Sequence, residues 1–331
     1  VGWLPRHMTL RHDGRLVAAL PVYVKGNSEG EFVFDWSWAD FAERSGIAYY
    51  PKIVVAVPFT PASGDRVLVT PDEDRAAVIS VVADAARAWC GKAGASGVHV
   101  LFPRDAEASA WEAAGYLRRD GFQYHWFRHG ARTFDDYLAR FTSKQRNQIK
   151  RELRGVTEAG IVVETLEPGA HSGDIAQAMY SFYESTIDKH GMWGRHYLTR
   201  AFFDAVIDRY RDRLAWVVAR EGASGRLVGG AFNVTRGTRL YGRYWGSAVD
   251  VPYLHFVVCY YAGIRFAIER GLDVFEPGAG GEHKRARGFV PTLTHSAHWL
   301  RDGRFRRALG PWLAHERERV RGLVESGGDG D

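Results

Sequence analysis

The sequence is poor in the residues that build disulfide or metal frameworks. Its 331 residues include only two cysteines, Cys90 and Cys259, and these lie too far apart in the sequence to form a Cys-x-x-Cys pair. A disulfide scaffold, a zinc site and a Cys-x-x-Cys redox motif are therefore excluded, and both cysteines are predicted to be core residues in a reducing compartment. A Gly-x-Ser-x-Gly nucleophile elbow is also missing. We therefore expect no covalent intermediate on a side chain and no requirement for a metal.

Long apolar runs are missing as well. A membrane helix needs about 20 uninterrupted apolar residues, whereas the longest apolar stretch, residues 254–268, contains His255 and Arg265. Val1 is not followed by the basic and apolar pattern of an export signal. We therefore expect no membrane span and a cytoplasmic protein.

Lysine is the third scarce residue type, because only seven of the 44 basic residues are lysines. Acidic residues number 39, so the net charge is 44 − 39 = +5, a modest excess that favours a polyanionic partner without requiring one. The 46% of hydrophobic and 25% of charged residues are typical of a globular protein. At roughly 150 residues per domain, the length predicts two domains.

Three segments recur in the same order along the chain, which indicates a duplicated domain. Segments 14–26 and 225–237 share Gly-Arg-Leu-Val. Segments 97–103 and 271–277 each begin with glycine and end with proline. Segments 115–127 and 288–300 have Gly-Tyr or Gly-Phe, with the glycine ten residues before the histidine of His-Trp.

Each copy is predicted to contain a strand hairpin, a third strand, a helix and a short buried strand that ends at proline. In the first copy these elements are the hairpin within 6–25 with its turn at Asp13 and Gly14, a strand at 32–38, a helix at 74–91 and a strand at 98–102. In the second copy they are the hairpin within 214–236, a strand at 239–246, a helix at 253–270 and a strand at 274–276, after helices near 134–158, 175–190 and 198–211. A further amphipathic helix is predicted at 312–324.

This order predicts an α/β fold with mixed sheets of the α+β kind. The predicted domains are 1–130 and 131–310, followed by a C-terminal helix and mobile tail at 311–331. The first copy begins at its hairpin, so we expect its opening strand and helix to lie before Val1.

Four strings of the sequence resemble those of the FemAB-like predicted N-acyltransferases: 34–40, 242–246, 276–284 and 286–291. The resemblance extends over nearly the whole chain. It implies two tandem acetyltransferase-like (GNAT-like) domains. It also implies transfer of an acyl or aminoacyl group to an amine of a small molecule or a cell-wall precursor in peptidoglycan synthesis.

The resemblance allows aminoacyl-tRNA or acyl-CoA as a co-substrate and implies no tightly bound cofactor. GNAT enzymes that use acyl-CoA carry a Gln/Arg-x-x-Gly-x-Gly/Ala turn, whose amides hold the pyrophosphate at a helix N-terminus. Neither 39–45 nor 247–255 contains this turn, and FemAB-like enzymes that use aminoacyl-tRNA likewise lack it. The alternatives are an acyl-CoA enzyme with an atypical site and a non-catalytic binding module. The oligomeric state stays open.

The segment 276–287 is predicted to carry the reaction, because ligands of open α/β sheets bind beyond the carboxyl ends of strands. We predict Glu276 as the general base, with His283 and Lys284 as further catalytic residues. Amides and cations that converge on an anion are predicted at Gly278, Gly280, Gly281, Arg285 and Arg287. The alternative is a tight turn with solvated basic residues. The first copy has Phe102 in place of Glu276, which favours the second copy as the reactive one.

The strand at 239–246 is predicted to line the donor channel. Strict alternation would place Tyr241, Arg243 and Trp245 on one face, with Gly242, Tyr244 and Gly246 on the other. Glycine beside aromatics suggests a close approach by a ligand or by backbone. We predict that Arg243, Tyr244, Trp245 and the nearby His255 bind substrate. Aromatic packing across strands and a structural histidine are the alternatives.

Two further segments carry candidate binding residues. Asp35, Trp36, Trp38 and Asp40 would hold a cationic amine by charge and cation–π attraction, or would form a core in which Asp40 caps the next helix. The helix near 143–154 has a basic face that would bind tRNA or another polyanion, unless it is simply solvated. The residues predicted to bind the polyanion are Lys144, Arg146, Lys150 and Arg151.

Overall fold

The computed structural model describes residues 2–170, 173–189 and 197–327, which form two compact units. The first unit consists of Val1–Gln123 and Pro291–Asp331, and the second consists of Tyr124–Val290. Strand β8 (Leu117–Phe127) contributes residues to both units. Within the described ranges, no helix has the length and hydropathy needed to cross a membrane.

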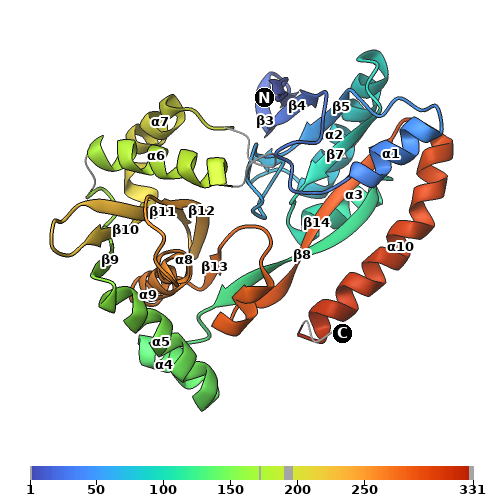
Figure 1. Cartoon of the computed structure of the whole chain (residues 1–331). Coiled ribbons are helices and arrows are strands. Elements are labelled where there is room, and N and C mark those ends of the chain that lie inside the picture. The colour runs from blue at the N-terminus through green and yellow to red at the C-terminus, as the bar shows by residue number, and fades with distance from the viewer. Residues whose placement is uncertain (1, 171–172, 190–196, 328–331) are drawn as a thin grey trace. The chain divides into compact units, whose positions relative to one another are not determined.

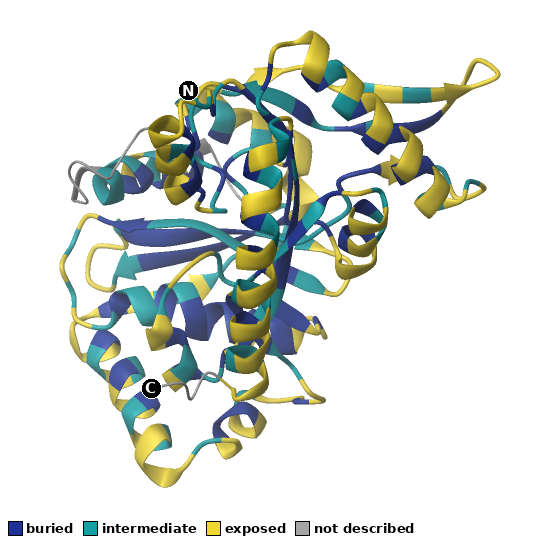
Figure 2. Cartoon of the chain, turned by 90° about the vertical axis from the view of Figure 1, so that its right-hand side faces the viewer, coloured by how far each residue is buried: buried dark blue, intermediate teal, exposed yellow. Residues whose placement is uncertain are grey.

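The first unit contains a mixed sheet in the order β1-β4-β5-β7-β14-β8 and a small sheet in the order β2-β3-β6. Its strands are β1 (Leu4–Pro5), β2 (Met8–His12), β3 (Arg15–Leu20), β4 (Val22–Lys25), β5 (Lys52–Val55), β6 (Leu68–Val69), β7 (Gly97–Leu101) and β14 (Val290–Leu300). Its helices are α1 (Trp36–Arg44), α2 (Arg75–Lys92), α3 (Asp105–Ala113) and α10 (Gly303–Glu325). Figure 2 shows most strands buried and the outer faces of the helices exposed.

Local sequence signals explain several of these elements. The β2–β3 turn places Asp13 and Gly14 in the left-handed region, at φ values of 49° and 79°, as the Asp-Gly signal predicted. The Asp74 carboxylate caps α2 by accepting hydrogen bonds from the amides of Ala76 and Ala77. Helix α10 begins nine residues before the predicted start at residue 312. Of the predicted mobile tail, residues 328–331 lie outside the described residues.

The second unit contains a sheet in the order β8-β13-β12-β11-β10-β9. Helices α6 and α7 lie on one face of strands β10–β12, and α8 and α9 lie on the other (Figure 1). Its strands are β9 (Ile161–Thr165), β10 (Leu214–Glu221), β11 (Leu227–Arg236), β12 (Arg239–Ser247) and β13 (Val274–Glu276). Its helices are α4 (Phe134–Ala139), α5 (Ser143–Glu158), α6 (Gly173–Lys189), α7 (Arg200–Tyr210), η2 (Arg211–Arg213), α8 (Leu254–Phe256), the π-helical η3 (Val257–Tyr261), α9 (Ala262–Glu269) and η4 (Glu282–Arg287).

The single helix predicted at 134–158 is two helices. Thr133 and Thr142 each cap a helix by a reciprocal capping box, with Asp136 and Gln145 as the respective partners. The Thr142 side chain accepts a hydrogen bond from the Gln145 amide, and this cap begins α5 and separates it from α4. The Thr-x-x-Gln spacing is the sequence signal for the break.

The two compact units differ from the predicted domains, because the last strands of the two repeats are exchanged. β14 belongs to the second repeat but pairs antiparallel with β7 of the first, with Ser296 opposite Leu101. The end of β8 belongs to the first repeat but pairs with β13 of the second, with Phe275 opposite Trp126. The segment from Pro291 onward therefore lies in the first unit instead of in the predicted domain 131–310.

The strand predicted at 32–38 is wrong. Residues 31–35 have no regular structure, and α1 begins at Trp36. Asp35 precedes the helix as a buried residue whose carboxylate accepts a hydrogen bond from Lys52 Nζ at 2.5 Å. This long-range ion pair fixes the chain at Asp35, and the alternating aromatics therefore do not continue as a strand.

Candidate active site

The end of β13 presents a buried carboxylate in the second unit. Glu276 is 2% exposed, and its Oε1 accepts a hydrogen bond from Arg239 Nη1 at 2.7 Å. The His125 Nε2 lies 3.9 Å from Glu276 Oε2. Burial first, and then the charges of Arg239 and Lys284, lower the pKa of His125 to about 3, so its imidazole is uncharged at neutral pH. The predicted base is thus held by a cation from β12, a partner outside the basic loop that follows it.

The loop after β13 folds around the buried Lys284. Its backbone is left-handed at Gly278, Gly280 and Gly281, where any other residue would be strained. The Lys284 Nζ donates to the carbonyls of Gly278 at 2.8 Å and Ala279 at 3.3 Å, which accounts for two of its three N–H groups. Burial lowers the pKa of Lys284 to about 8. A lysine with such a pKa can hold a proton or release it near neutral pH.

A bulge in β12 changes the predicted faces. Phe232 of β11 pairs with Tyr244, and the next residue, Asn233, pairs with Gly242, so Arg243 is the extra residue. Tyr244 and Tyr241 therefore share one face, while Gly242 shares the other with Trp245. The prediction that Tyr241, Arg243 and Trp245 share a face is wrong, since simple alternation cannot include a bulge.

The close approach predicted at the glycines of β12 is made by the protein's own backbone. A Cβ on Gly246 would lie 1.9 Å from the carbonyl oxygen of Phe182 in α6. A Cβ on Gly242 would lie 3.1 Å from the Cα of Pro277, directly after Glu276. The hydrogen-bonded pairing of β12 with β13 ends at Tyr241 and Glu276. The two chains stay in contact one residue further, because Gly242 has no side chain to separate it from Pro277.

Several predicted residues gather on the Trp245 face of the sheet, around the π-helical segment η3. The His255 ring lies 4.6 Å from that of Trp245 and 5.2 Å from that of Tyr260, and burial lowers the pKa of His255 to about 4. The Tyr260 hydroxyl bonds the Nε2 of His283 at 2.8 Å. Tyr244 lies on the opposite face, where its ring is 5.3 Å from that of Tyr183 and Arg243 lies over it. π-helical turns occur frequently at functional sites.

Arg285 and Arg287 both lie in η4, where Arg285 is half-buried and Arg287 is buried. Arg287 donates to Glu152 of α5 at 2.8 Å and to the His283 carbonyl at 2.7 Å, and its guanidinium lies 3.4 Å from the centre of the Phe256 ring. Through these contacts Arg287 holds the loop on α5, and its anion-binding role stays a prediction.

The basic face of α5 is present as predicted. Lys144, Lys150 and Arg151 are exposed, while Arg146 is half-buried and donates to the Phe141 carbonyl at 3.0 Å. Lys150 also lines a cavity with residues of α9 and β9.

The pocket predicted at Asp35, Trp36, Trp38 and Asp40 is not formed. Trp36 is 49% exposed and Asp40 is exposed, whereas Trp38 is buried 4.8 Å from the His298 ring, centre to centre. The Asp35 carboxylate accepts hydrogen bonds from the Tyr49 hydroxyl and from Lys52. Since α1 places the two indoles on different sides of a helix, the acidic and aromatic groups do not converge.

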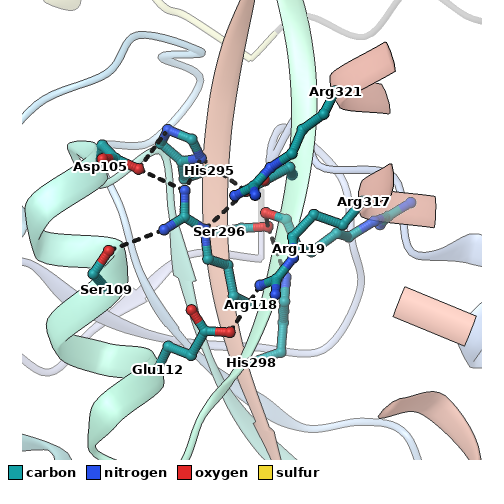
Figure 3. A network of polar contacts seen from close by, with 11 residues as sticks. Asp105, Ser109, Glu112, Arg118, Arg119, His295, Ser296, His298, Arg317 and Arg321 are labelled. Carbon is teal, nitrogen blue, oxygen red and sulfur yellow. Dashed lines mark hydrogen bonds and ion pairs between the residues drawn. The ribbon is translucent and has the colours of Figure 1, made fainter. Parts of the chain in front are cut away.

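The sequence analysis missed the buried polar networks of the first unit. Lys52 is fully buried and donates to Glu31, Asp35 and Ser28. A second network joins β8, β14, α3 and α10 through Arg118, as Figure 3 shows. Its buried centre is Asp120, whose Oδ1 lies 2.8 Å from His295 Nδ1 and whose Oδ2 accepts from Arg321.

Two signals could have located some of the missed residues. Lysine is scarce, and Lys25, Lys52 and Lys284 are buried, which is three of the six lysines whose burial the structure describes. The repeat match pointed to His125, which aligns with His298, and both are buried. Nothing in the sequence marked Arg239 as the partner of Glu276. Among the described residues, no group of three or more His, Cys, Asp or Glu side chains is arranged to hold a metal.

The family comparison identifies the chain. The family described as FemAB-like, peptidoglycan biosynthesis/recognition, matches residues 1–327. The chain belongs to the FemAB-like family. No curated protein matches this FemAB-like chain in sequence.

Solved structures share the fold of this FemAB-like protein at low identity. The crystal structure of FemX is 11% identical with a TM-score of 0.54, covering 93% of this chain and 91% of FemX. The C-terminal domain of a protein assigned as a lysylphosphatidylglycerol synthetase from Agrobacterium fabrum is 15% identical with a TM-score of 0.58, covering 99% and 91%. L-PGS from Bacillus licheniformis is 11% identical with a TM-score of 0.56, covering 95% and 89%. The predicted fold class, an α/β fold with mixed sheets, is confirmed, and these solved structures share it.

Proposed function

We propose that the protein is an N-acyltransferase that moves an acyl or aminoacyl group to an amine of a small molecule or a cell-wall precursor. The observation that carries the proposal is the end of β13, where the buried Glu276 is fixed by Arg239 and is followed by the loop that holds Lys284. The family's link to peptidoglycan supports an acceptor from the cell wall. The similarity to lysylphosphatidylglycerol synthetases, whose name denotes an aminoacyl lipid product, supports aminoacyl transfer.

In the proposed reaction, the amine nitrogen attacks the carbonyl carbon of the donor ester. The new C–N bond forms, the C–O bond to the donor breaks, and the amine proton passes to Glu276, which Arg239 orients. The third N–H of Lys284 stabilises the oxyanion and then supplies a proton to the leaving oxygen, which its pKa of about 8 allows. Solvent exchange returns the proton from Glu276 to Lys284. We propose aminoacyl-tRNA as the donor, with the exposed Lys144 and Arg151 of α5 contacting its phosphates.

The donor is tested by a thermal-shift measurement with charged tRNA and, separately, with acetyl-CoA. We expect charged tRNA to raise the melting temperature and acetyl-CoA to leave it unchanged. Stabilisation by acetyl-CoA alone would reject the tRNA donor and favour an acyl-CoA enzyme. Reversing Lys144 and Arg151 to Glu should weaken tRNA binding and flatten its salt dependence. Unchanged binding would mean that this face is only solvated.

Catalysis is tested by single-turnover transfer to an amine acceptor with Glu276→Gln and Lys284→Met. We expect each variant to lose transfer by 10²-fold or more while still binding the donor. Full transfer by Glu276→Gln would remove Glu276 from the mechanism. If neither donor binds the native protein and Glu276→Gln preserves its cellular function, the protein is a binding module instead.

A further inference from the structure

A cavity of about 510 Å³ opens in the second unit where α5 and α9 pack on the edge strand β9. Its volume lies within the ~300–1,000 Å³ that is usual for small-molecule sites. On α5, Lys150, Leu153, Arg154 and Thr157 follow the i, i+3, i+4, i+7 spacing, so they form one stripe along the cavity. The cavity is therefore built by regular elements of one unit and does not depend on a loop.

The mouth of this cavity carries positive charge. Lys150, Arg154 and Arg265 are exposed, and none of the eleven lining residues is acidic. Arg265 is positioned by the Phe134 ring, whose centre is 3.8 Å from its guanidinium. Arg154 forms one exposed pair, with Glu158, and within the described part of the chain neither Lys150 nor Arg265 pairs with a carboxylate. The three cations are thus available to an anionic ligand.

The inner wall is aliphatic. It is formed by Leu153, Val156, Ile161, Val163, Val257 and Ala262. The one aromatic lining residue, Tyr261, donates its hydroxyl to the buried carboxylate of Glu152, so it needs no partner from a ligand. Proteins bind unpaired nucleobases by stacking them on aromatic side chains, and this wall offers one such ring. An aliphatic wall instead favours a hydrocarbon chain, at about 0.8 kcal/mol for each buried methylene.

We propose that this cavity binds an anionic lipid, with its acyl chain between α5 and α9 and its phosphate at Lys150, Arg154 and Arg265. A single ligand then accounts for both properties of the site, the apolar wall and the exposed cations at its mouth. The proposal does not rest on the transferase function, because none of these residues belongs to the Glu276 site. The proposal gives Lys150 a different ligand from Lys144 and Arg151, which lie on the same helix but do not line the cavity.

The test is flotation of the full chain with phosphatidylglycerol vesicles and with phosphatidylcholine vesicles. We expect binding to the anionic vesicles, and at least a 25-fold loss in the Lys150→Glu, Arg265→Glu variant, since each cation near an anionic surface contributes about 1 kcal/mol and reversal also adds repulsion. Lys144→Glu, Arg151→Glu on the same helix is the matched control, since it reverses the same number of charges outside the cavity, and it should lose no more than about fivefold. Equal losses in the two variants would overturn the proposed site.

Soluble ligands distinguish a bound lipid from surface attraction. Decyl phosphate should bind at least tenfold more tightly than inorganic phosphate or decanol, and Thr157→Trp, which fills the exposed mouth, should abolish its binding. Thermal melts of each variant establish that the fold is kept. Failure of both decyl phosphate and anionic vesicles to bind would overturn the proposal. So would an RNA oligonucleotide that requires Lys150 and Arg265 while lipids do not bind.

Discussion

The Lys52 network of the first unit gives a sharp prediction for stability. Lys52 is fully buried, with its Nζ 2.9 Å from Glu31 Oε2 and 2.5 Å from Asp35 Oδ2, and Lys25 Nζ lies 3.9 Å from the other oxygen of Glu31. The two positive charges of Lys25 and Lys52 balance the two negative charges of Glu31 and Asp35 in this cluster. Lys52→Met keeps the aliphatic volume but leaves one surplus negative charge in the core.

The geometry sets the size of the effect. At an effective dielectric of 20, unit charges 2.9 Å apart attract by about 6 kcal/mol, and desolvation cancels part of that energy. Removing one partner of a buried pair typically costs about 3–5 kcal/mol. We therefore expect Lys52→Met to destabilise the first unit by ~3–5 kcal/mol. Lys92→Met, which removes an exposed lysine, should change its stability by less than ~0.5 kcal/mol.

Hydrogen exchange resolved by mass spectrometry measures this loss in one unit at a time. Peptides from β5 should lose protection, and peptides from β10 serve as the internal reference from the second unit. Adding Asp35→Asn removes the surplus charge, so the double variant should recover a large part of the loss. A cost below 1 kcal/mol for Lys52→Met, or a double variant no more stable than the single one, would refute this reasoning.

The same cluster predicts a dependence on pH. Burial raises the pKa of Glu31 from 4.5 to about 7, against the opposing charge of Lys52. The folded state therefore holds this proton more tightly than the unfolded state, and the contribution of Glu31 to stability falls as the pH rises from about 4.5 to about 7. In Lys52→Met the counter-charge is gone, so the penalty should be smaller at pH 5.5 than at pH 8.5. Equal penalties at both pH values would contradict the assignment.

Three further outcomes are expected. Gly246→Ala should destabilise the second unit by ~2 kcal/mol or more in urea melts, because its Cβ would overlap the Phe182 carbonyl, whereas Gly322→Ala in the open part of α10 should be neutral or stabilising. Arg287→Met should lower the stability of the second unit by about 3 kcal/mol, because the buried Glu152 carboxylate loses its cation, and adding Glu152→Gln should restore part of that stability. A loss under 1 kcal/mol would refute this structural role of Arg287. Burial lowers the pKa of Lys284 from 10.5 to about 8, so stability should rise between about pH 8 and 10.5. That rise should be smaller in Lys284→Met, and an unchanged slope would place the ammonium in solvent.

The regular elements could be predicted from the sequence where one face is apolar. The β10–β11 hairpin and α2 follow the predicted bounds closely, because their patterns repeat with the period of a strand or a helix. The strand predicted at 32–38 failed because its aromatic alternation imitates a strand, whereas the ion pair of Asp35 with Lys52 connects residues 17 positions apart. No local window includes such a partner.

The candidate site was predicted in part. Glu276, the glycine loop and Lys284 could be placed because a buried strand ends at a proline followed by glycines. Arg239 could not, since its contact with Glu276 depends on the register of β12 with β13. Arg243 could not be oriented either, because a bulge is a property of two paired strands and is not visible in one of them.

The exchanged strand β14 affects how the chain acquires its structure during synthesis. Residues 124–290 form a continuous unit that can complete its sheet as soon as they leave the ribosome. The first unit must wait, since β14 lies between β7 and β8, and Leu101 meets its partner Ser296 only 195 residues later. At about 5–20 residues per second, this interval is roughly 10–40 s. Throughout that time the edge of β7 that receives β14 lacks its partner, so we expect the sheet whose strands are synthesised first to be completed last.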